Sequence, residues 1–123
     1  MSTVEELFEF AKNQFSFEPL EGVFNSGVCL SGFVAEGGPR LLLIAGAGDE
    51  GFIDAFAVFA DSTQTQPEDA IARVGMNCRL GLQLLGPFYA LRTYFEAETT
   101  TIDSFVRELA LLHSAAKRLT EKA

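Results

Sequence analysis

The residue of this sequence best suited to acid–base chemistry is its single histidine, His113. It falls four positions after Leu109, at the border of an apolar stripe in the last third of the chain. A catalytic histidine needs a nucleophile or a carboxylate within hydrogen-bond reach, and the sequence places no serine or cysteine nucleophile beside it. We therefore interpret His113 as a residue at the edge of the core, with a small enzyme that uses it beside an acid as the alternative.

One glycine-rich stretch has the spacing of a nucleotide-binding loop. Residues 46–51 read Gly-Ala-Gly-Asp-Glu-Gly, a G-x-G-x-x-G pattern that directly follows an apolar run. A dinucleotide site would need a helix next, but the residues from Phe52 alternate as a strand does. Asp49 and Glu50 would also repel a phosphate. We predict a hairpin turn at this position and no cofactor.

The remaining reactive side chains have structural explanations. Cys29 and Cys78 lack a histidine or further cysteine at ligand spacing, so we expect two reduced, buried thiols and no metal. Neighbouring acids suit helix capping or solvation better than catalysis: Glu5/Glu6, Glu68/Asp69 and Glu96/Glu98. The sequence therefore predicts a protein without catalytic, cofactor-binding or metal-binding residues, and not an enzyme.

The charge of the chain bears on its partners. Nine basic and 17 acidic residues give a formal net charge of −8. Phosphate binding needs clustered Lys and Arg, which are scattered here, so we expect no nucleic-acid partner and instead a basic one. No apolar run reaches the length of a membrane span and the N-terminus lacks a basic-then-apolar signal pattern, which predicts a cytoplasmic location without a membrane partner.

Three apolar runs in the first half of the chain predict a sheet. They cover Val28–Ala35, Arg40–Ala47 and Phe52–Ala60, separated by Gly37-Gly38-Pro39 and by residues 48–51. The short glycine-containing gaps indicate hairpin turns, so the strands should be antiparallel neighbours. Neither side of these strands is consistently polar, so we expect both faces of the sheet to be covered.

Helical segments flank these strands. Overlapping capping boxes at Ser2/Glu5 and Thr3/Glu6 predict a first helix that ends near Phe15. Pro67 opens a second helix to about Arg79, with an extension to Leu84 as the alternative. A strand over Phe88–Ala97, a short strand near Leu82–Leu85 and a last helix over Ile102–Leu119 complete the chain. We predict one domain over residues 1–123 with an α+β fold, ordered α-βββ-α-β(β)-α, in which helices pack on an antiparallel sheet.

This order resembles the class I type III secretion chaperones and the related YbjN-like regulators. The resemblance covers Thr3 to Leu119 and rests on size, acidity and element order. Gln66–Ala70 opens the second helix of this order, and the stretch from Gly86–Arg92 through Thr101–Phe105 is the part most similar to the family. One feature departs from it: the family has two full strands between the second and third helices, where this chain offers only Gly81–Ala97.

The resemblance implies a bacterial cytoplasmic homodimer that binds the N-terminal region of a secreted effector in extended form. The alternative is a YbjN-like regulator or an immunity-type protein that binds a folded partner. We predict that the second helix forms the dimer interface, through Ile71, Val74, Gly75, Cys78 and Leu82.

A sheet that is apolar on both faces has more apolar surface than three helices cover, so part of it should bind a client. We predict that the client contacts the first helix and the first three strands. The residues are Phe8, Phe10, Phe15, Phe17, Val28, Leu30, Phe33 and Leu41.

Overall fold

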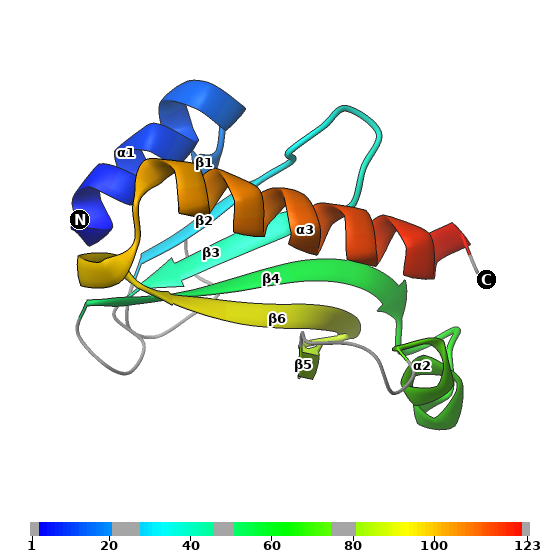
Figure 1. Ribbon diagram of the computed structural model, residues 1–123. Helices are drawn as coiled ribbons and strands as arrows, with labels where there is room; N and C mark the ends of the chain where they lie inside the picture. Colours follow the sequence, from blue (N-terminus) through cyan, green and yellow to red (C-terminus); the bar gives the residue numbers. More distant parts are fainter. Residues whose placement is uncertain (1–2, 21–27, 46–50, 75–80, 122–123) are drawn as a thin grey trace.

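The computed structural model describes residues 3–20, 28–45, 51–74 and 81–121 (Figure 1). In these residues three α-helices pack with a six-stranded antiparallel sheet, which confirms the predicted α+β class. The elements in chain order are α1 (Val4–Phe15), β1 (Glu18–Pro19), β2 (Val28–Gly32), β3 (Leu41–Ala45), β4 (Phe52–Asp61), α2 (Pro67–Val74), β5 (Gly81–Leu85), β6 (Phe88–Glu96), the 3₁₀ turn η1 (Ala97–Thr99) and α3 (Ile102–Glu121).

The order of the strands in the sheet is β1-β2-β3-β4-β6-β5. β2 pairs antiparallel with β3, and β3 with β4, so strands that follow one another in the chain are neighbours in this half of the sheet. The chain then leaves through α2 and returns at the outer edge as β5, and β6 fills the place between β5 and β4. The β5–β6 turn needs only Gly86 and Pro87, and Gly86 has a φ of 59°, which glycine adopts without steric strain.

Both long helices lie on one face of the sheet (Figure 1). Alternate strand residues point toward them and form the main core with the apolar stripes of α1 and α3. The largest completely buried side chains of this core are Leu7, Leu30, Leu41, Leu43, Ile53, Leu91, Phe105, Leu109 and Leu112. The short helix α2 lies apart from the two long helices, and its Ala70 and Val74 pack against the same core.

The opposite face of the sheet is also apolar at its centre. Cys29, Leu42, Ile44, Phe56 and Ala90 form a second, smaller cluster there. The prediction that the sheet is apolar on both faces is therefore correct. Helices α1 and α3 take only one of these faces.

The first helix begins as predicted. The Thr3 hydroxyl accepts a hydrogen bond from the Glu6 backbone N at 3.1 Å, and the Glu6 carboxylate accepts one from the Thr3 backbone N at 3.3 Å. This reciprocal pair is a capping box, and it satisfies two backbone donors that the first turn leaves free. The second predicted box includes Ser2, which lies outside the described residues.

The segment between α2 and β6 differs from one prediction. Residues Gly81–Leu85 pair along their whole length with β6, from Gly81 opposite Arg92 to Leu85 opposite Phe88. The extension of the second helix to Leu84 is therefore wrong, because these residues gain strand pairing instead. The short strand predicted near Leu82–Leu85 is confirmed as the five-residue β5, so two strands stand between α2 and α3.

Other strand limits shift by a few residues. The strand predicted for Val28–Ala35 ends at Gly32, and the one predicted for Arg40–Ala47 spans Leu41–Ala45 in the described residues. Most of the glycine-rich turn at 46–51 lies outside them, but β4 begins at Phe52 as expected. No described helix is long and apolar enough to cross a lipid bilayer.

Candidate functional site

Half of the residues predicted to bind a client belong to the core. Leu30 and Leu41 are completely buried on the side of the sheet that faces the helices, and Phe8 and Phe17 are buried with them. The Phe17 ring lies over the backbone of Gly32, where an added Cβ would stand 2.5 Å from a ring carbon. These four side chains offer no surface to a client in this structure.

Phe10 and Phe15 lie at the margin of the core, where α1 meets α3. The two rings meet edge to face at 6.0 Å, and the Phe10 ring meets Phe105 of α3 at 6.5 Å. Phe10 does not share the helix face of Leu7, Phe8 and Ala11, which are buried in the core. In the structure this position packs sideways onto α3 and is only partly open to solvent.

The last two predicted contacts are exposed but separate. Val28 is 57% exposed at the start of β2, and Phe33 is 43% exposed just after its end. The Arg40 guanidinium lies 5.4 Å from the Phe33 ring centroid and donates to the Ser31 hydroxyl at 2.9 Å. The eight predicted residues therefore do not form one continuous surface.

The predicted dimer residues divide between two elements. Ile71 on α2 is 60% exposed, whereas Val74 is half-buried against the core. Leu82 is also half-buried, but it belongs to strand β5 rather than to the second helix. Gly75 and Cys78 lie outside the described residues.

An exposed, uncharged strand edge is the feature that the sequence did not predict. β5 is the last strand of the sheet, and in the part of the chain that the structure describes it pairs only with β6. It carries no charged residue and no proline, and Leu84 is 56% exposed. Phe88, opposite Leu85 at the hairpin, is 40% exposed. An unpaired apolar edge of this kind is a template for another strand.

The polar groups of the described residues do not assemble into a reaction centre. The Nδ1 of His113 is buried and has no hydrogen-bond partner in the described part of the chain, so no acid or nucleophile engages it. The Arg92 guanidinium pairs with the Asp54 carboxylate, and both groups are partly exposed. No group of three histidine, cysteine or acidic side chains within the described ranges could hold a metal ion.

The pKa values of two side chains, Cys29 and Asp61, are shifted from their ordinary values. Burial raises the pKa of the Cys29 thiol, which lowers the fraction of reactive thiolate at neutral pH. The backbone N and the hydroxyl of Thr63 each donate to Asp61 at 2.8 Å, and these bonds lower the pKa of the Asp61 carboxyl. Asp61 is thus a fixed, exposed negative charge at the end of β4.

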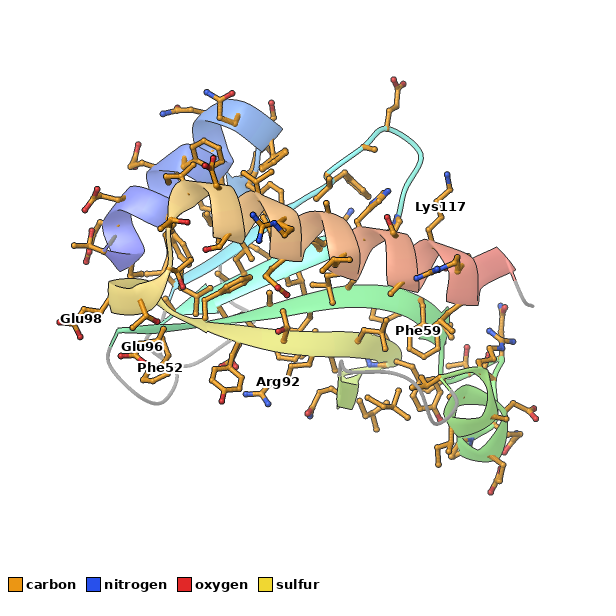
Figure 2. All side chains as sticks on the ribbon, in the orientation of Figure 1. Phe52, Phe59, Arg92, Glu96, Glu98 and Lys117 are labelled. Atoms are coloured by element: carbon orange, nitrogen blue, oxygen red, sulfur yellow. The ribbon has the colours of Figure 1, made fainter. Side chains whose placement is uncertain are left out.

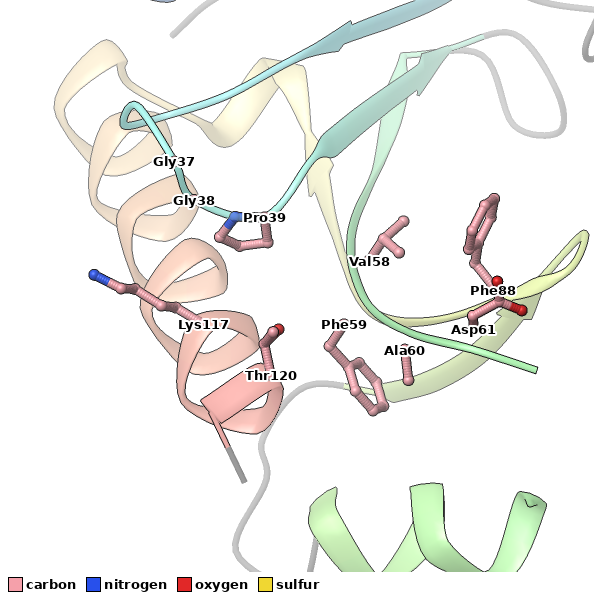
Figure 3. A pocket seen from close by; sticks show the side chains of 10 residues that line it. All are labelled: Gly37, Gly38, Pro39, Val58, Phe59, Ala60, Asp61, Phe88, Lys117 and Thr120. Carbon is pink, nitrogen blue, oxygen red and sulfur yellow. The ribbon is translucent and has the colours of Figure 1, made fainter. Parts of the chain in front are cut away.

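A cavity of about 420 Å³ adjoins Asp61 (Figure 3). One wall is the β2–β3 loop, the floor is the end of β4, and the other wall is the last turns of α3. Its lining is mostly apolar and consists of Gly37, Gly38, Pro39, Val58, Phe59, Ala60, Asp61, Phe88, Lys117 and Thr120. The described structure thus has two surfaces suited to binding, the β5 edge and this cavity.

Comparison of the sequence with models of known protein families found no matching family, and comparison with curated proteins found no significant match.

Proposed function

We propose that this chain is a chaperone of the type III secretion class, which binds the N-terminal region of a secreted effector in extended form. The observation that supports this most is the full strand β5. It gives the described residues the order α-βββ-α-ββ-α, apart from the two-residue β1, and thereby removes the one departure from the family pattern. In this proposal the chain acts as a homodimer in the bacterial cytoplasm and catalyses no reaction.

The physical basis is binding by strand pairing and apolar burial. An extended client that adds to a free sheet edge satisfies its own backbone and places alternate side chains in surface hollows. Each large apolar side chain that it buries contributes about 1.5–3 kcal/mol, before the cost of ordering the segment. The net charge of −8 favours clients with basic residues around these side chains.

The second copy is proposed to dock through α2 and β5. An antiparallel pair of β5 strands related by a two-fold axis would place Gln83 opposite Gln83 of the second copy and Leu82 opposite Leu84. This arrangement is self-complementary, because β5 holds no charge that would meet its like. Ile71, exposed on α2, supplies further apolar surface for the same contact.

The oligomeric state is the first test. We expect light scattering at micromolar concentration to give the mass of a dimer, and Ile71→Glu to shift the protein toward monomer. Leu111→Glu introduces the same charge at an exposed leucine of α3 and should leave the dimer intact. A monomeric wild-type chain would contradict the dimer.

The client is the second test. We expect co-expression with the product of a neighbouring gene for a large secreted protein to give a stable complex. In the complex, an N-terminal segment of that protein should resist limited proteolysis. Hydrogen exchange should show that this segment lacks a folded core. A complex formed only through a folded domain would support the regulator or immunity-type alternative instead.

A further inference from the structure

The cavity at the end of β4 is built around a stretch of strand without a neighbour on one side. β3 begins at Leu41, opposite Ala57, and the last bond across this edge runs from Val58 N to the Arg40 carbonyl at 3.0 Å. β4 continues to Asp61, paired on its other side with Phe88 of β6. In the described residues no strand pairs with 59–61 on the side of the cavity. The Asp61 carbonyl already accepts from the backbone N of Gln64 and of Thr65, so it is the edge at Phe59 and Ala60 that is open to an added strand.

The loop that borders this edge is seated on α3. Gly38 lies so close to His113 that an added Cβ would stand 2.2 Å from the ring carbon Cε1. The Gly38 backbone N also donates to the Ala35 carbonyl at 3.1 Å. Figure 3 shows the loop on the side of α3, with the cavity between Pro39 and the end of β4. The loop thus forms a wall of the cavity and does not fill it.

The lining specifies the chemistry of an occupant. The exposed Phe88 and the partly exposed Pro39, Val58 and Ala60 form an apolar surface above the buried Phe59, and the Asp61 carboxylate stands at its edge (Figure 3). The Lys117 side chain points away from the apolar lining. An apolar group beside a positive charge therefore matches this site. The volume lies within the range of small-ligand sites, which admits side chains but not a folded domain.

We propose that this cavity binds one extended segment of the client, which adds a short strand to 59–60 and inserts an apolar side chain between Pro39 and Phe88. A lysine or arginine of the same segment lies beside Asp61. The proposal rests on the proposed function, which supplies the extended client. It places a contact with that client at the end of β4, beside the β2–β3 loop. The β5 edge then remains available to the second copy of the chain.

The probe is a short acetylated peptide, Ser-Lys-Ile-Thr-Val-Lys-Ser, added to the isotope-labelled chain and followed by amide shifts in NMR spectra. We expect shifts concentrated at Gly37, Gly38 and 59–61. A peptide with glutamate in place of both lysines should bind more weakly. A peptide methylated on its central backbone nitrogens should also bind more weakly, because it cannot pair with β4.

Charge variants test the contact with Asp61. Asp61→Asn should weaken the binding of the lysine-containing peptide about two- to fivefold, as expected for an exposed ion pair. Glu98→Gln removes the same charge at the end of the molecule opposite Phe59 (Figure 2) and should change affinity by much less. Thr120→Arg adds a positive charge at the rim of the cavity without altering β4. It should also weaken the binding of the lysine-containing peptide, because like charges repel.

Three outcomes would overturn the site. The first is equal weakening by Asp61→Asn and Glu98→Gln, which would indicate general charge attraction. The second is a set of shifts confined to other residues, such as β5, which would leave the proposed function standing while removing this cavity from it. The third is the absence of shifts with every peptide up to about 1 mM. A dissociation constant of about 1 mM corresponds to a binding free energy near −4 kcal/mol. The chaperone function is then judged separately by the co-expression experiment.

Discussion

In the contact between Gly38 and His113, a side chain capable of acid–base chemistry has a packing role. The imidazole supports the β2–β3 loop from below, and the absence of a side chain at Gly38 allows the loop to approach it. His113 is half-buried on α3, which agrees with its interpretation as a residue at the edge of the core. Its buried Nδ1 lacks a partner in the described residues, so the contact is one of shape rather than of hydrogen bonding.

Substitution of this glycine should therefore be costly. We expect Gly38→Ala to lower the free energy of unfolding by about 1–3 kcal/mol, because the methyl group must displace the ring or the loop. Urea denaturation measures the change. The control is Gly81→Ala on β5, where the nearest atom to an added Cβ is 3.9 Å away. His113→Ala should restore part of the stability of the Gly38→Ala variant, and equal losses at the two glycines would refute this account.

The reactivity of Cys29 follows from its burial. Its sulfur lies in the second apolar cluster, and burial raises the pKa of the thiol, which lowers the fraction of reactive thiolate. We expect iodoacetamide to label Cys29 at least about tenfold more slowly in the native protein than in urea. Mass spectrometry of the peptide that contains Cys29 separates it from Cys78. Equal rates in the two states would show that Cys29 is accessible.

At the scale of elements, local signals in the sequence predicted most helices and strands. The capping box at Thr3 and Glu6 located the start of α1, and Pro67 located the start of α2. The glycine-containing turns separated β2, β3 and β4. These signals act over a few residues, so they can be recognised without knowledge of the fold.

The assignment of β5 depended on distant residues. Leu82 and Leu85 fall near the helical spacing of Ile71 and Val74, and the same apolar run also fits a strand. Pairing with β6 decided between the two. The burial of several predicted client residues has a related cause. With apolar side chains on both faces of a strand, the sequence does not say which face receives the helices, and Leu30 and Leu41 proved to face them.

The β5 edge gives a prediction at this scale. Lysine on an edge strand opposes pairing with another strand because its charge must be desolvated. We expect Leu84→Lys to convert the proposed dimer to monomer in light scattering while the far-UV circular dichroism stays unchanged. The matched control is Leu111→Lys, at an exposed leucine of α3. A dimer that survives Leu84→Lys would place the interface elsewhere.

For the whole molecule, the charge of −8 is the dominant electrostatic property. Among the described residues, Lys12 pairs with Glu9 and Arg92 with Asp54, and both pairs are partly exposed. Repulsion among the acids therefore opposes the compact state and is screened by salt. We expect the melting temperature to rise by a few degrees between low and physiological ionic strength, measured by calorimetry. A fall in melting temperature would mean that attractive pairs outweigh the repulsion.

The position of β6 between β4 and β5 has a consequence for synthesis on the ribosome. β4 is complete at Asp61, but its neighbour on that side begins only at Phe88, after α2 and β5 have emerged. Helix α3, which covers much of the main core, emerges later still. Until then the nascent chain carries an open strand edge and an uncovered apolar face, the conditions under which chains aggregate or recruit other chaperones. A protein proposed to shelter the unfolded segments of others thus passes through a stage in which its own sheet needs the same shelter.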